Sequence, residues 1–113
     1  MSTAYALTKY QRISAQKVRP VARCITGMHV EKAVKSLSHV PKKAAKLVFK
    51  VLSSAMANAE NNHGMDLDEL FVKEVHVDEG PMLKRWRARA KGRSNRILKR
   101  SCHVKVIVAE KKG

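Results

Sequence analysis

The chain has 113 residues, about the length of one ordinary domain, and we expect a single domain. Its 24 Lys and Arg outnumber 9 Asp and Glu, and this net charge of +15 indicates a polyanionic partner, because an unneutralised excess repels itself in a compact chain. No apolar run reaches the roughly 18 residues of a membrane span, and the first residues lack a signal-peptide pattern, so we expect no membrane partner and a cytoplasmic protein.

The N-terminal part of the chain predicts a strand and two short helices. Residues 4–13, AYALTKYQRI, show the mixed alternation of an extended strand. Ser14 can cap a first helix that Gly27 would end, and Pro20 would remove one backbone hydrogen bond and kink it. The segment HVEKAVKSL, residues 29–37, repeats the helical spacing of apolar residues and predicts the second helix.

The strongest helix pattern begins at Pro41, a favoured first position, and runs to about Asn61. Its predicted buried stripe comprises Ala45, Val48, Leu52, Ala55, Met56 and Ala59. Four lysines gather toward the start of this helix, namely Lys42, Lys43, Lys46 and Lys50. The helix dipole disfavours cations there, and an external anion would relieve the conflict. Two interpretations stay open for these lysines: phosphate contacts or a solvated helix face.

From Leu70 onward the apolar period changes to two, which indicates strands. The predicted buried faces carry Phe71, Val75 and Val77 in one strand, and Val104, Val106 and Val108 in the other. The chain between these strands could form a hairpin, so we expect them to be antiparallel neighbours. The predicted fold class is therefore α+β, with about three helices packed on a small antiparallel sheet and a long basic β-hairpin extending from the body.

That hairpin corresponds to a basic stretch: residues 84–100 hold nine Lys and Arg and no acid. From Arg85 to Arg93 a cation stands at every second position, a spacing that lines one face of a strand but wraps around a helix. Gly92 allows the chain to reverse. We call residues 81–99 the arm, and residues 1–80 with 100–113 the body. The arm would reach roughly 30 Å and order fully only among phosphates. Its expected nucleic-acid contacts on the outgoing strand are Lys84, Arg85, Arg87 and Arg89.

Trp86 stands among these cations. An exposed indole could stack on an unpaired base, as in many RNA-binding surfaces. It could equally pack across the hairpin and stiffen it, and the sequence does not separate the two interpretations.

Three segments resemble the bacterial large ribosomal subunit protein twenty-two family: SAQKVRPVA (14–22), KKAAKLVFKVLSSAMANAENNHGMD (42–66) and VDEGPMLKRWRARAKGRSNRILKRSCHVKVIVAE (77–110). The resemblance implies a structural constituent of the large subunit that binds ribosomal RNA, supports assembly and lines the peptide exit tunnel. It implies a tunnel-lining tip at Lys91, Gly92 and Arg93, and RNA contacts by Arg96, Lys99 and Arg100 on the return strand. The implied partners are large-subunit ribosomal RNA, neighbouring ribosomal proteins and the nascent polypeptide; no homo-oligomer is expected.

Other functional classes find little support in the residues. No nucleophile, base and orienting group can be named together, and no histidine has a metal-ligand spacing, so we expect no enzyme, no cofactor and no metal site. Cys24 and Cys102 are expected to be reduced, largely buried thiols. The alternatives are a DNA-binding protein, with a β-ribbon arm or a helix-turn-helix, and a membrane-surface binder, which would need a basic amphipathic helix instead.

Overall fold

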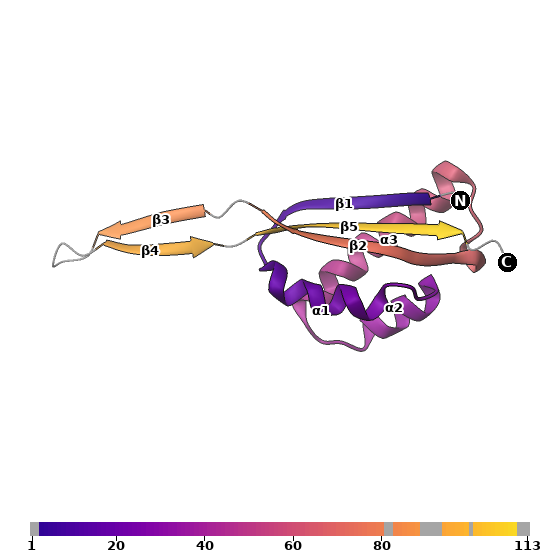
Figure 1. Ribbon diagram of the computed structural model, residues 1–113, viewed down its shortest axis with the longest axis horizontal. Coiled ribbons are helices and arrows are strands. Elements are labelled where there is room, and N and C mark those ends of the chain that lie inside the picture. Colours follow the sequence, from indigo (N-terminus) through magenta and orange to yellow (C-terminus); the bar gives the residue numbers. More distant parts are fainter. Residues whose placement is uncertain (1–2, 81–82, 89–93, 100, 111–113) are drawn as a thin grey trace.

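The computed structural model describes residues 3–80, 83–88, 94–99 and 101–110. In chain order the elements are β1 (Thr3–Gln11), α1 (Ala15–Ile25), α2 (Val30–Ser38), α3 (Lys43–His63), a 3-10 turn (Leu67–Glu69), β2 (Leu70–Glu79), β3 (Leu83–Ala88), β4 (Ser94–Lys99) and β5 (Cys102–Glu110). Three helices pack on an antiparallel sheet of order β1-β5-β2, while β3 and β4 form a separate hairpin (Figure 1). The predicted α+β class is confirmed.

The first two helices follow the predicted pattern. Ser14 is the N-cap residue of α1, although its side chain makes no capping hydrogen bond. The helix runs on through Pro20, which is exposed, so water can reach the Gln16 carbonyl that lacks an N–H partner. Gly27, with φ of 88°, follows the end of α1 and donates its N–H to the carbonyl of Val72 over 2.7 Å. The end of α1 is thereby tied to β2.

Helix α3 begins two residues later than predicted. Pro41 belongs to the connection from α2, and the N-cap residue Lys42 has extended backbone angles of −119° and 147°. The start is set by packing, because Ala44 and Ala45 are the first residues of the helix to enter the core. Within the predicted stripe only Met56 is partly buried rather than buried, and Ala44 and Val51 join the buried set.

The prediction that Phe71 lies on the buried face of β2 is wrong. Val72 pairs with Val108 and Glu74 with Ile107, so Lys73 is an extra residue in a β-bulge. A bulge moves every later side chain to the other face. Leu70 and Val72 are therefore fully buried before the bulge, Val75 and Val77 pack against the core after it, and Phe71 is only partly buried on the opposite face.

The core lies between the helices and one face of the sheet. In β5, Val104, Val106 and Val108 are fully buried as predicted, and Cys102 joins them. Cys24, on α1, is exposed, so the expectation of two buried thiols is wrong for this residue; it occupies the solvent side of the helix, one position before the buried Ile25. Both thiols are free.

The arm makes the molecule elongated. The whole molecule measures 67 × 26 × 17 Å along its principal axes. Its radius of gyration is 17.4 Å, against about 13 Å for a compact chain of this length. Strands β2 and β5 pair along their lengths. In the sequence β3 follows β2 and β4 precedes β5, so the hairpin leaves one end of the sheet (Figure 1). None of the helices in the described part of the chain has the length and hydropathy that a membrane span requires.

Candidate nucleic-acid interface

The described strands of the arm form the predicted hairpin. Leu83 pairs with Lys99 at one end and Ala88 with Ser94 at the other. Of the predicted RNA-binding residues, β3 contains Lys84, Arg85 and Arg87, and β4 contains Arg96 and Lys99. Outside the described residues lie Arg89 and Arg100, together with the predicted tip residues Lys91, Gly92 and Arg93.

The register of the hairpin separates like charges. Each described cation stands opposite an uncharged residue, the pairs being Lys84 with Leu98, Arg85 with Ile97, Arg87 with Asn95, Arg96 with Trp86, and Lys99 with Leu83. Like charges directly opposite each other destabilise a strand pair, and this register avoids them. Because residues 83–99 contain no acid, none of these charges can be neutralised within the hairpin. Any neutralising anion must therefore come from outside the hairpin.

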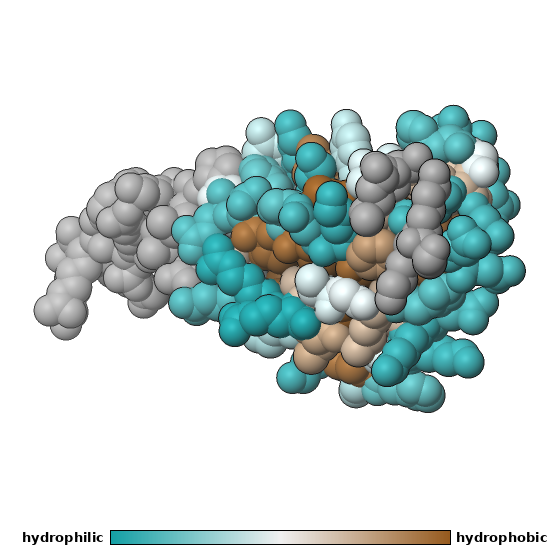
Figure 2. All heavy atoms as spheres, turned by 45° about the vertical axis from the view of Figure 1, so that its right-hand side comes forward, coloured by the Kyte–Doolittle hydropathy of each residue, from teal (hydrophilic) through white to brown (hydrophobic). Residues whose placement is uncertain are grey.

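The body also carries cations without acidic partners. Among residues 3–80 and 101–110, the only contact within 4 Å between a carboxylate and a Lys, Arg or His side-chain nitrogen joins Glu74 and His76, whose Oε2 and Nε2 lie 2.9 Å apart. The α3 lysines 42, 43, 46 and 50 are all exposed, and the Lys43 ammonium donates to the carbonyl of Arg12 over 3.1 Å. Figure 2 shows hydrophilic side chains around smaller apolar areas on the visible face of the body. The geometry leaves both interpretations of the lysines open.

The base of the arm contains a pair of residues that sequence reasoning missed. The backbone N–H of Tyr10 donates to Nδ1 of His103 over 3.0 Å, and the two rings meet edge to face with centroids 4.9 Å apart. The residues are 93 positions apart, so no local pattern joins them. The one available signal is an aromatic residue between cations in the sequence KYQR, residues 9–12.

The described residues offer little for metal or acid–base chemistry. Among them, no three His, Cys, Asp or Glu side chains gather closely enough to hold a metal ion, and no polar or charged residue is buried. Burial raises the pKa of the Cys102 thiol and so keeps it in the neutral, unreactive form. The observations that remain are an extended basic hairpin and a cationic body.

Comparison with known families agrees with this arrangement. A family model described as ribosomal protein L22p/L17e matches residues 6–109, a span that includes the whole arm and most of the body. Proteins of this family are structural components of the large ribosomal subunit that bind ribosomal RNA, which favours the ribosomal interpretation over the DNA-binding and membrane-surface alternatives. The chain therefore belongs to the ribosomal protein L22p/L17e family, in agreement with its α+β fold and its acid-free basic hairpin.

Proposed function

We propose that the arm grips large-subunit ribosomal RNA through its phosphates and that the tip of the arm lines the peptide exit tunnel. The observation that carries this proposal is the hairpin itself, which extends from one end of the sheet and contains cations without a single acid. The phosphate contacts are assigned to Lys84, Arg85, Arg87, Arg89, Arg96, Lys99 and Arg100. The tip is assigned to Lys91, Gly92 and Arg93, which would contact a nascent polypeptide in transit.

The proposed mechanism of RNA binding is electrostatic rather than sequence-reading. Phosphate contacts fix the position of a protein on RNA but carry no base information, and several cations acting together dominate the affinity. A hairpin that is two strands wide can enter between RNA helices and contact phosphates on more than one side. We propose that the arm supports subunit assembly in this way, by holding separate RNA segments around itself while the body contacts neighbouring ribosomal proteins.

The proposal separates two roles along the arm. The sequence predicts the chain reversal at Gly92, so Lys91 and Arg93 are assigned to the tunnel interior. Arg96 and Lys99 on β4, with Arg100 next to them in sequence, are assigned to RNA affinity. The tip variant Lys91→Ala/Arg93→Ala should incorporate into large subunits nearly normally while changing the passage of tunnel-sensitive nascent chains. The return-strand variant Arg96→Ala/Lys99→Ala/Arg100→Ala should reduce incorporation itself.

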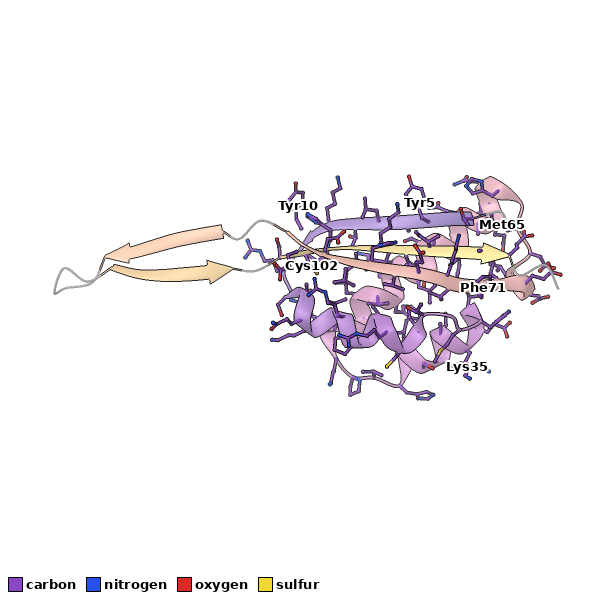
Figure 3. The ribbon with its side chains drawn as sticks, in the orientation of Figure 1. Tyr5, Tyr10, Lys35, Met65, Phe71 and Cys102 are labelled. Atoms are coloured by element: carbon purple, nitrogen blue, oxygen red, sulfur yellow. The ribbon has the colours of Figure 1, made fainter. Side chains whose placement is uncertain are left out.

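A charge-matched control is available on the body. Lys32 and Lys35 are exposed on α2, and Lys35 lies far from the arm in Figure 3. The variant Lys32→Ala/Lys35→Ala removes the same charge as the tip variant and should change neither quantity. If the tip variant fails to incorporate while the return-strand variant incorporates normally, the assigned roles are wrong.

A further inference from the structure

Tyr10 has an unusual backbone at the base of the arm. Strand β1 pairs with β5 up to Thr8 and again at Gln11, and the register shifts between these two residues. Within this irregular stretch Tyr10 adopts φ of 57°, and it is the only non-glycine residue in the described part of the chain with a positive φ. Large side chains rarely adopt this conformation, and such strain persists where surrounding contacts hold it.

Those contacts come from His103 on β5. Nδ1 of His103 accepts the Tyr10 backbone N–H, which assigns the imidazole to the neutral form with its proton on Nε2. The ring planes of the two residues make an angle of 87°. The position of the Tyr10 ring is therefore fixed from the central strand of the sheet, although the residue lies in a bulged segment of an edge strand.

The fixed ring contributes little to the core. Tyr10 is 64% exposed, the highest value among the large exposed apolar residues described. Burial of apolar area is the main stabilising contribution of an aromatic side chain, and here most of that area stays in water. A strained backbone that presents an exposed ring thus has no evident purpose in folding, and the arrangement points to an external partner for the ring.

The charges around Tyr10 indicate what that partner is. Lys9 and Arg12 flank it in sequence and are exposed, and the Lys43 ammonium lies 3.1 Å from the Arg12 carbonyl. Two acids lie on β2, across the sheet from this end of β5: Asp78 pairs with His103, and Glu79 pairs with Cys102. Figure 3 places Tyr10 at the end of the body from which the arm leaves. An aromatic ring beside cations, next to a basic arm, has the composition of a surface that binds unpaired nucleotides.

We infer that Tyr10 stacks on an unpaired base of large-subunit ribosomal RNA, with Lys9 and Arg12 meeting the phosphates beside that base. This stacking site lies on the body and requires RNA binding by the chain, but it does not require the tunnel-lining tip. A neighbouring ribosomal protein is the other conceivable occupant, and the flanking cations favour RNA over it.

The test compares ring-removing and ring-preserving variants of the full chain in binding to a large-subunit ribosomal RNA transcript. Tyr10→Leu should weaken binding by about 5- to 150-fold, the range for loss of one stacked base, whereas Tyr10→Phe should bind like the unchanged protein. Tyr5→Leu is the matched control, because Tyr5 is 56% exposed on the same strand but the Lys105 ammonium covers its ring at 4.4 Å from the centroid. The salt dependence of binding should be the same in all variants, because no cation is removed.

A second variant separates stacking from a structural role. Tyr10→Gly removes the ring, keeps the backbone N–H to His103 and suits the positive φ, so it should melt no lower than the unchanged protein while losing RNA affinity as Tyr10→Leu does. Binding of Tyr10→Leu and Tyr10→Gly within twofold of the unchanged protein would overturn the inference. So would an equal loss in Tyr10→Phe, which would assign the effect to the hydroxyl. Reduced subunit incorporation with unchanged RNA binding would assign Tyr10 to a protein neighbour instead. Failure of the arm variants leaves this outcome unaffected, so the two proposals can fail separately.

Discussion

Gly80 and Ser101 face each other across the point where the arm leaves the body. The N–H of Gly80 donates to the carbonyl of Ser101 over 2.9 Å, one residue beyond the pair formed by Glu79 and Cys102. A Cβ atom at position 80 would lie 2.5 Å from Oγ of Ser101 and 3.2 Å from Cε1 of His103. A side chain at position 80 would therefore require Ser101 and His103 to shift, and His103 is the histidine that holds Tyr10.

We predict that Gly80→Ala destabilises the body by about 1–2 kcal/mol, the usual range for overpacking a tight contact. The Ser101 hydroxyl can rotate away, but the His103 ring must also shift. Urea unfolding of Gly80→Ala, Ser101→Ala and the double variant would measure the coupling, and removing the hydroxyl should recover part of the loss. Equal stability of Gly80→Ala and the unchanged protein would show that the junction adapts without cost.

The body should fold without the arm. The buried side chains described in the structure come from β1, the three helices, β2, β5 and the loops beside them. Replacing residues 82–99 by a short turn should therefore leave a domain with the same helical circular dichroism and a cooperative thermal transition. A chain that stays unfolded after this replacement would mean that the arm contributes to the core, and the separation of body and arm would be wrong.

The two cysteines should differ strongly in reactivity. Cys24 is exposed, whereas Cys102 is fully buried and its pKa is raised by burial. Since the thiolate is the nucleophile, iodoacetamide at neutral pH should label Cys24 in the folded protein and Cys102 only after unfolding. Rapid labelling of both thiols in the folded protein would contradict this expectation, and mass spectrometry would identify the sites.

The raised pKa of Cys102 also makes the stability of the protein depend on pH. In the unfolded chain the Cys102 thiol ionises in its ordinary range, while the folded state still holds it protonated. The unfolded state then binds fewer protons, so the free energy of unfolding should fall as the pH rises past that range, and a Cys102→Ser variant should lose this slope.

The sequence predicted the elements well where the pattern is local. The helical stripe of α3 and the alternation of β5 place Val48 and Val106 in the core, because a regular period leaves only one face to bury. The face of Phe71 could not be predicted in this way. The bulge at Lys73 arises from pairing with β5, in which Val108 lies 36 positions after Val72 and Ile107 lies 33 positions after Glu74, and no residue within β2 predicts it.

The same distinction between local and long-range pattern applies to the candidate site. The arm was predictable because its charge pattern is contiguous and its strands adjoin in sequence. The junction was not, since Tyr10, Gly80 and His103 come from three distant segments that only the sheet brings together. The exposure of Cys24 also depends on which face of α1 packs, and a single cysteine carries too little signal to decide that.

Trp86 offers a direct reporter of the arm, because it is the only tryptophan of the chain. If an unpaired base stacks on the indole, titration with a large-subunit ribosomal RNA transcript should quench its fluorescence, and Trp86→Ala should weaken binding by about 5- to 150-fold. Trp86→Phe, which keeps an aromatic ring, is the control. Unchanged fluorescence on binding would favour the other interpretation, in which the indole packs across the hairpin.

Binding should also depend steeply on salt, because phosphate contacts release counterions. The slope of log affinity against log salt concentration should be roughly −0.7 to −0.9 for each phosphate neutralised. Replacing Arg96 and Lys99 by Ala should make the slope shallower by up to about 1.4–1.8, whereas Tyr10→Leu should lower the affinity without changing the slope. The two effects distinguish cations from a stacked ring within one set of titrations. A slope that stays the same when both cations are removed would mean that the return strand does not contact phosphate, and the assigned role of the arm in RNA binding would then be wrong at these positions.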